Sequence, residues 1–148
     1  DFLSSRSALR PDRTSTPFEL GLEGMVAFDK PHFNGRRALL RLAGSKPRRK
    51  LVQIEVDRDK PAVNALVYHR QKKEVGMVTS ALWSPTCKRN IAYAWLDAPY
   101  CEPGSEDLWV EIYLQKEIRW QRRMERCRIV TKQFFSHERR TATPPAGF

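Results

Sequence analysis

Apolar and polar residues alternate through the middle of the chain. Between Leu51 and Val56, one side carries Val52, Ile54 and Val56 and the other carries Leu51, Gln53 and Glu55, which is the period of a half-buried β-strand. The same period predicts four further strands, at residues 65–70, 73–83, 89–97 and 108–114. A turn around Gln71 and Lys72 would join the first two of these as a hairpin. One side of the last carries Leu108, Val110, Ile112 and Leu114. Short strands in this number are typical of an antiparallel barrel or sandwich.

A short helical turn is expected before the strands, at residues 16–21. Thr16 can cap its N-terminus, and Glu19 follows three residues later, which is the spacing of a capping box. Pro17 suits the first helical position, and Gly21 can end the turn.

A second helix is expected around residues 34–44. Asn34 is predicted as its N-cap and Gly44 as its C-terminal stop. Leu39 and Leu42 would share one face of this helix. Three arginines are expected to project outward from it: Arg36, Arg37 and Arg41.

The segment 115–130 fits two structures. It is rich in good helix formers, and as a helix it would bring Trp120, Met124 and Cys127 onto one face. As a strand it keeps the alternation of Ile118, Trp120 and Met124. Cys127 and Ile129 would then require a one-residue slip such as a β-bulge. Periodicity alone does not decide between the two.

The composition fits one globular domain. With 148 residues, 41% of them hydrophobic, the chain can bury about two-thirds of the surface that its unfolded form exposes. No apolar run approaches the roughly 18 residues of a membrane-spanning helix and no signal-peptide pattern is present, so we expect a soluble protein. Because the first residue is Asp1 rather than Met, we expect a processed or excised chain that other residues precede.

The charge balance is strongly basic. The chain has 27 Lys and Arg against 17 Asp and Glu, a net charge of +10 that would attract nucleic acid, an anionic membrane surface or a polyanionic small molecule. Cys87, Cys101 and Cys127 are odd in number and far apart. This pattern argues against a disulfide framework and a zinc site, and it favours a reducing compartment.

The sequence lacks the usual catalytic and nucleotide-binding motifs. Gly44–Lys46 has no upstream Walker glycine, and neither G-x-G-x-x-G nor G-x-S-x-G occurs. His32, His69 and His137 have no partner at metal-ligand spacing and are expected to be surface or packing residues. Four tryptophans and four tyrosines interleave with basic residues. This arrangement fits a platform for single-stranded nucleic acid, or packing in a core or against a partner domain.

Five sequence motifs follow one another in a specific order: "STPFELGL", "FDKPHFNGRRALL", "RRKLVQIEVD", "EVGMVTSALWSPTCKRNIAYAWLD" and "LWVEI" with a later "FF". In order and spacing they resemble the C-terminal part of the glycine cleavage T-protein (aminomethyltransferase) family, over roughly residues 14–135. The most specific element comprises Thr79, Ser80, Ser84, Pro85, Asn90, Ile91 and Ala92. In this family such an elbow joins two strands of a C-terminal β-barrel. Pro85 would fix the corner, while Ser80 and Asn90 would satisfy backbone groups beside it.

The resemblance implies a mainly β fold, an antiparallel β-barrel of about six strands preceded by short helices, with Arg119 to Val130 as a strand. It also implies tetrahydrofolate as the cofactor of one-carbon transfer. Members move an aminomethyl carbon to folate and release ammonia, demethylate small N-, O- or S-methyl compounds, or are fused to flavin oxidases of dimethylglycine and sarcosine. Their catalytic aspartate and most pterin contacts lie in two N-terminal lobes. No catalytic residue is therefore expected in this chain, and the 148 residues alone are predicted to be inactive.

The resemblance implies a folate-binding role for Arg139, with Arg140 adjacent. In the family, a side chain in the tail, a few residues past the last strand, reaches the folate side, and counting from Phe134 and Phe135 places Arg139 there. A guanidinium can bond bidentately to a folate glutamate carboxylate. A solvated tail arginine is the alternative. Gly24 stands where some members have a tryptophan, so that segment is not expected to stack on folate.

The expected organisation is a connector at 1–13, a barrel domain with leading helices at 14–135 and a tail at 136–148. The leading hypothesis is the C-terminal barrel of a tetrahydrofolate-dependent aminomethyltransferase-like protein in the cytoplasm or mitochondrial matrix. Its expected partners are the N-terminal lobes of the same protein, with a lipoyl carrier protein as a further candidate, and neither a membrane nor nucleic acid. The alternatives are the same domain from a folate-dependent demethylase or flavin oxidase fusion, and a basic β-barrel module for single-stranded nucleic acid.

Overall fold

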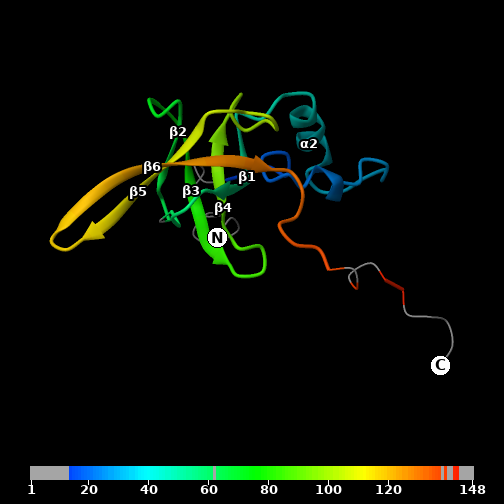
Figure 1. The fold of residues 1–148 in the computed structure, drawn as a ribbon. Coiled ribbons are helices and arrows are strands. Elements are labelled where there is room, and N and C mark those ends of the chain that lie inside the picture. The colour runs from blue at the N-terminus through cyan, green and yellow to red at the C-terminus, as the bar shows by residue number, and fades with distance from the viewer. Residues whose placement is uncertain (1–13, 62, 138, 140–141, 144–148) are drawn as a thin grey trace.

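A computed structural model of the chain describes residues 14–61, 63–137, 139 and 142–143. Six antiparallel strands close into a barrel in the order β1-β4-β3-β2-β5-β6 (Figure 1). They are β1 (Arg49–Val56), β2 (Leu66–His69), β3 (Lys73–Ser84), β4 (Arg89–Asp97), β5 (Leu108–Lys116) and β6 (Arg119–Val130). The predicted mainly β barrel is confirmed, and the segment that fitted either a helix or a strand is a strand.

The barrel interior is aliphatic. Its fully buried side chains include Ile54, Val67, Val78, Ala94, Leu96, Leu108 and Val110. The predicted inward side of β5 is confirmed, since Leu108, Val110 and Ile112 are buried and Leu114 packs against the core. None of the eight tryptophans and tyrosines belongs to the buried core. Tyr100 packs against this core from outside it, so these aromatic residues do not fill the barrel interior. The alternative expectation, that they pack against a partner domain, stays a prediction.

Gly76 lies where β3 and β4 come close together. It pairs with Leu96, and a β-carbon added there would lie 2.0 Å from the carbonyl oxygen of Trp95. The pairing of β2 with β3 also shifts register between Val67 and Tyr68, next to the pair of Val67 with Gly76. A residue without a side chain is therefore required at this point of the barrel wall.

The hairpin between β2 and β3 turns one residue earlier than predicted. Its central residues are Arg70 and Gln71, with φ of 53° and 59°, and Lys72 N–H donates to the carbonyl of His69 at 3.2 Å. Positive φ at both central positions gives the turn the twist that the flanking strands need.

The predicted turn before the strands is confirmed. Thr16 N–H donates to the Glu19 carboxylate at 2.8 Å, and Glu19 N–H donates to Thr16 Oγ1 at 3.3 Å, which completes the capping box. Gly21 ends the turn with a φ of 68°. Leu51 N–H donates to the carbonyl of Glu19 at 2.7 Å, so this turn is fastened to β1.

The predicted helix is α2 (Arg36–Ala43), preceded by the 3-10 turn η2 (Glu23–Met25). Its N-cap is Gly35, with a φ of 88°, rather than Asn34, while Gly44 is its C-cap as predicted. Arg36 does not project outward as expected, because its guanidinium donates to the carbonyl of Phe28 at 3.1 Å. The helix buries none of its residues. Neither described helix is long and apolar enough to cross a membrane.

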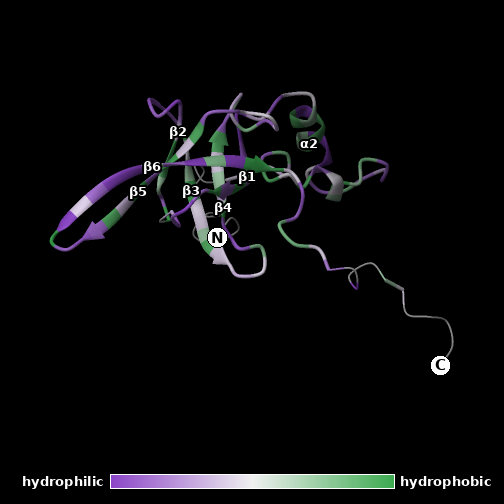
Figure 2. Ribbon diagram, viewed as in Figure 1, coloured by the Kyte–Doolittle hydropathy of each residue, from purple (hydrophilic) through white to green (hydrophobic). Residues whose placement is uncertain are grey.

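Strand β6 is regular and has no bulge against β5. Cys127 pairs with Leu108 and faces the interior, and the register continues without a shift to the pair of Lys116 with Arg119. The expected one-residue β-bulge is wrong. The expectation treats Ile118 and Trp120 as interior residues, whereas they are 96% and 68% exposed. Figure 1 shows the end of this hairpin projecting from the barrel, and Figure 2 shows that β6 is hydrophilic along most of its length.

Candidate functional site

The elbow between β3 and β4 holds the start of the C-terminal tail. The chain turns over residues 85–88, and Ser84 Oγ accepts a hydrogen bond from Cys87 N–H at 3.2 Å. The thiol of Cys87 donates to the carbonyl of Phe134 at 3.1 Å. The elbow motif and the "FF" ending, which are far apart in the sequence, therefore meet in space.

Two expected polar roles at the elbow are assigned differently by the structure. Asn90 does satisfy a backbone group, but in the loop after β1: its Nδ2 donates to the carbonyl of Arg58 at 2.6 Å. Ser84, rather than Ser80, binds the backbone of the elbow. The sharp corner that begins at Pro85 is confirmed.

The tail places Arg139 on the surface beyond this contact. The ring of His137 accepts a hydrogen bond from Arg139 N–H at 3.1 Å, and it meets the ring of Phe135 edge-on at 6.3 Å. Arg139 is exposed, and its guanidinium has no ion pair within the described part of the chain. Arg140 lies outside the described residues. The folate role of both arginines stays a prediction.

A carboxylate that binds two arginines lies beside the elbow. Arg89, two residues after Cys87, donates to Glu55 Oε2 at 2.7 Å. Arg128 of β6 donates to the same oxygen, with its Nη2 2.6 Å away. The Glu55 side chain is only 12% exposed, whereas the arginines are 53% and 60% exposed. One anion thus holds two cations in fixed positions, and the group keeps a net positive charge that faces solvent.

A groove of about 650 Å³ runs along the outside of β1 between the first turn and the tail. Its walls come from residues 20–23, from β1 and Tyr93, and from residues 129–131 and 133. Lys50 lies on the groove and donates to Glu102 at 3.0 Å, a hydrogen bond that raises the pKa of Lys50. Cys101 and Pro103 also line the groove, which has the size of a small-molecule site.

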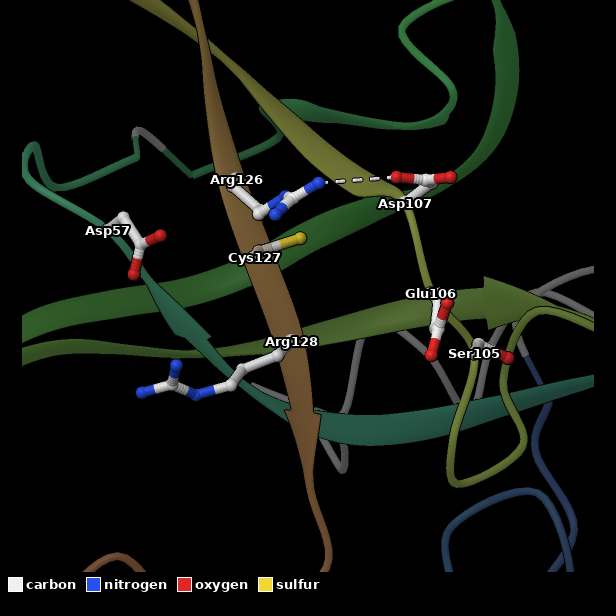
Figure 3. Close-up of a pocket in the computed structure, with 7 residues that line it drawn as sticks. All are labelled: Asp57, Ser105, Glu106, Asp107, Arg126, Cys127 and Arg128. Carbon is white, nitrogen blue, oxygen red and sulfur yellow. Dashed lines mark hydrogen bonds and ion pairs between the residues drawn. The ribbon is translucent and has the colours of Figure 1, made fainter.

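A second hollow, of about 410 Å³, opens at the end of the barrel where β6 passes the loop before β5 (Figure 3). It is lined by Asp57, Ser105, Glu106, Asp107, Arg126, Cys127 and Arg128. Arg126 reaches toward Asp107, 3.3 Å away, and Arg128 extends away from them in Figure 3. Burial raises the pKa of the Cys127 thiol to about 12, so this thiol is not a nucleophile at neutral pH.

The structure forms no catalytic constellation from the predicted polar residues that it describes. His69 packs its ring against Tyr100 at 4.8 Å, and Ser84 binds backbone. No group of three or more His, Cys, Asp or Glu side chains among the described residues is placed to hold a metal ion. The ring contact of His69 agrees with the packing role that the sequence predicts for it. Ser84 helps to form the turn at the elbow.

Several aromatic faces are covered by cations of the same chain. Arg49 lies over Trp95 at 4.7 Å, and Arg126 lies over Trp109 at 5.4 Å. A stacking platform for nucleic-acid bases needs open aromatic faces, and these pairs occupy them. These two rings are therefore covered on one face and less open to bases, whereas Trp83 and Trp120 are 51% and 68% exposed.

Sequence reasoning missed a buried carboxylate on the outside of the barrel. Glu111 accepts hydrogen bonds from Tyr68 at 2.9 Å, from Tyr113, and from Arg122 Nε at 2.8 Å, although only 7% of it is exposed. The hydrogen bond from the Tyr113 hydroxyl lowers the pKa of Glu111 most, followed by those from the Tyr68 hydroxyl and the Arg122 guanidinium. Alternation correctly points Glu111 outward, and no local pattern signals that side chains of β2 and β6 cover it.

Comparisons with known proteins agree on one relationship. Residues 49–135, which hold all six strands, match the family model of the glycine cleavage T-protein C-terminal barrel domain. An aminomethyltransferase of Alkaliphilus metalliredigens is 36% identical over 126 residues, which are 84% of this chain and 31% of the relative. One from a Thermoanaerobacter species is 38% identical over 104 residues, or 69% of this chain and 27% of the relative.

A solved structure shows the same fold. The glycine cleavage system aminomethyltransferase T of Bartonella henselae superimposes with a TM-score of 0.67 at 20% sequence identity, covering 83% of this chain and 33% of that one. The chain thus spans about a third of the length of the proteins that it matches.

Proposed function

Because this chain belongs to the family of glycine cleavage T-protein C-terminal barrel domains, we propose that it is the closing lobe of a folate site in a tetrahydrofolate-dependent aminomethyltransferase-like protein. The matched segments make up 31% and 27% of the relatives named as aminomethyltransferases, which are therefore about three to four times as long as these segments. The N-terminal lobes that complete such a protein are its proposed first partner, and a lipoyl carrier protein is a further one. The cytoplasm or the mitochondrial matrix is the proposed location.

The hydrogen bond from Cys87 to Phe134 is the observation that carries the proposal. It fixes the tail at 3.1 Å from the elbow, so the residues that follow leave the barrel from a defined point. Arg139 is five residues beyond Phe134 and carries an exposed guanidinium. A tail that is anchored at its root can place a cation with less loss of conformational entropy than a free one.

The charges of this region fit an anionic ligand. Arg89 and Arg128 share the single carboxylate of Glu55, which leaves a net positive charge next to the elbow. Glutamate carboxylates of folate are the kind of group that a free guanidinium binds bidentately. Arg139 and Arg140 are the residues that would hold this end of the cofactor.

Tetrahydrofolate, when bound, supplies the nitrogen atoms that accept a one-carbon unit. The part of this chain would be to orient the cofactor tail and to exclude water from one side of the site. Burial raises the pKa of Cys101 and Cys127, which disfavours the thiolate form of both. We place the carbon transfer itself in the N-terminal lobes, with the isolated chain inactive.

The native size of the polypeptide tests the proposal. An antibody raised against residues 49–135 should detect, in the source cells, a product roughly three times as long as this chain, as the 31% share of the relative implies. That product should bind tetrahydrofolate in a titration, and the isolated chain should not. A native product of the length of this chain, or a long product that ignores tetrahydrofolate, would refute the proposed lobe.

A further inference from the structure

The end of the β5–β6 hairpin extends beyond the barrel wall. β5 pairs with β2 only at residues 108–110, and β6 pairs with β1 only at residues 127–130. Residues 111–116 and 119–126 therefore pair only with each other among the described strands, and we call this two-stranded ribbon the arm (Figure 1). At the base of the arm the carbonyl of Arg126 accepts a hydrogen bond from Asp57 N–H at 3.0 Å. Beyond that point no described strand pairs with either outer edge of the arm.

The arm carries large apolar side chains that the barrel does not cover. Ile118 at the turn is 96% exposed, Trp120 is 68% exposed and Tyr113 is 56% exposed. Tyr113 pairs with Arg122 and Gln115 pairs with Trp120, so Tyr113 and Trp120 stand on the same face of the ribbon. Aromatic and apolar residues in such exposed clusters mark binding surfaces, since a solvated strand does not need them.

The β6 strand of the arm is strongly basic. Four of its residues between 119 and 126 are arginines: Arg119, Arg122, Arg123 and Arg126. Glu125, the acidic residue within that stretch, is only 7% exposed. Lys116 and Arg119 face each other beside the turn, and neither has an ion pair with any described residue. The other three arginines are ion-paired: Arg122 with Glu111, Arg123 with Asp59 and Arg126 with Asp107. Uncompensated positive charge among the described residues of the arm is therefore concentrated at Lys116 and Arg119, beside the turn.

The base of the arm is fixed to the barrel. The carboxylate of Glu111 holds Tyr68 of β2 and Arg122 of β6 at 2.9 Å and 2.8 Å, and it also holds Tyr113. Further down, Arg126 covers the ring of Trp109 at 5.4 Å. Glu111 ties the two strands of the arm to each other and to β2, and Arg126 ties β6 to β5, so the base of the arm is held in one orientation before any partner binds.

We propose that the free edge of β6 in the arm is a docking site for an acidic, extended segment of another polypeptide, which pairs with it as an additional strand. Backbone hydrogen bonds would supply the affinity, and carboxylates of the segment would meet Arg119 and Lys116 beside the turn. Apolar side chains of the segment would cover Ile118 and Trp120. This surface is separate from the elbow and the tail, so the inference does not depend on the proposed folate role.

Two other occupants fit the arm less well. A second copy that paired edge to edge through β6 would bring arginines against arginines, which is repulsive. Insertion of the arm into a bilayer would leave the unpaired N–H and C=O groups of both edges in hydrocarbon, at a cost of several kcal/mol for each group. An acidic strand satisfies the backbone and the charge together.

Synthetic peptides test the docking site directly. The probe is a short labelled peptide in which glutamate alternates with valine, and its affinity for the folded chain is measured by fluorescence anisotropy. One comparison peptide has glutamine in place of glutamate, and another has a central proline, which removes a donor and disrupts strand pairing. The variants are Arg119→Glu and Trp120→Gln. Their matched controls are Arg41→Glu on α2 and Trp83→Gln, since Trp83 is 51% exposed on β3.

We expect the glutamate peptide to bind, and to lose about tenfold or more in affinity for the two arm variants but not for the controls. Both comparison peptides should bind about tenfold more weakly to the unaltered chain. Equal binding of the glutamine or proline peptide, or no binding of the glutamate peptide, would overturn the proposal. Binding of the chain to phosphatidylserine vesicles but not to the peptide would also overturn the proposal, because a membrane would then occupy the arm. A dimer in solution that Trp120→Gln abolishes would overturn it too, because a second copy would then occupy the arm.

Discussion

The thiol of Cys87 and the carbonyl oxygen of Phe134 lie 3.1 Å apart and share a hydrogen bond, although 47 positions separate them in the chain. This bond closes a loop that runs from the elbow through β4, β5 and β6. The tail is therefore attached to the barrel at Phe134.

Removal of this bond should free the tail without unfolding the barrel. A thiol is a weak donor and Cys87 is only partly buried, so Cys87→Ala is expected to lower the free energy of unfolding by roughly 1 kcal/mol or less. Limited proteolysis should nevertheless cut after Phe134 faster than in the unaltered chain. Cys101→Ala is the control, because the Cys101 thiol is buried in the core and is not the group that binds Phe134. Equal cleavage of the two variants would contradict the anchoring role.

The Glu111 cluster should give the fold a dependence on acid. Hydrogen bonds from Tyr113, Tyr68 and Arg122 lower the folded-state pKa of Glu111 below its unfolded value of about 4.3. Its contribution is therefore present above that value and is lost as the pH falls through the lower folded pKa. Denaturant titrations of the unaltered chain and of Glu111→Gln should differ most near neutral pH and converge in acid.

The same cluster should act in the opposite sense at alkaline pH. The hydrogen bonds to Glu111 raise the pKa of Tyr68 and Tyr113. Their contribution is present below an unfolded pKa of about 10 and is lost as the pH rises through the folded values. Glu117→Gln, at the exposed turn of the arm, serves as the control and should keep the pH profile of the unaltered chain. An unchanged profile in Glu111→Gln would show that the cluster does not stabilise the fold.

Gly76→Ala should be among the most destabilising small changes in the chain. The added carbon would meet the Trp95 carbonyl at 2.0 Å, and a backbone atom of a paired strand cannot move aside without breaking the β3–β4 pairing. A loss of about 2 kcal/mol or more is expected. Gly24→Ala has no neighbour within 4 Å and should stay within about 0.5 kcal/mol. Similar losses in the two variants, measured by urea unfolding, would contradict the close approach.

Cys127 should be silent toward thiol reagents in the folded protein. Its pKa of about 12, caused by burial and then by Asp57, leaves almost no thiolate at pH 8. Iodoacetamide should modify the partly buried Cys87 first, and Cys127 only as the barrel unfolds. Peptide mass spectrometry of timed samples distinguishes these sites. Native labelling of Cys127 at the rate of Cys87 would contradict its placement in the interior.

The strands of the barrel could be predicted because alternation is a local property. Leu108, Val110 and Ile112 follow the interior of β5 residue by residue, and the capping box of Thr16 and Glu19 also lies within one turn. The N-cap of α2 could not be assigned in this way, since Asn34 and Gly35 both suit that position and the backbone of the incoming loop selects Gly35. For β6, the spacing of exposed apolar residues on the arm resembles that of an interior face, and this spacing predicts a bulge that is absent.

The candidate site depends on contacts that no sequence period encodes. The resemblance identified the elbow and the tail as separate motifs, and only the folded barrel brings Cys87 to Phe134. The cluster around Glu111 is equally non-local, because its partners come from β2, β5 and β6. The roles of Arg139 and Arg140 remain predictions that rest on their positions in the tail.

Tetrahydrofolate binding by the full-length polypeptide, measured by calorimetric titration, tests the central claim most directly. A charge-assisted hydrogen bond contributes about 1.5–3 kcal/mol, so Arg139→Ala combined with Arg140→Ala should weaken binding by roughly 10- to 100-fold. The matched control, Arg37→Ala combined with Arg41→Ala on α2, should leave the dissociation constant unchanged. Equal affinities of the unaltered polypeptide and the tail variant would contradict the claim that this lobe closes a folate site through its tail.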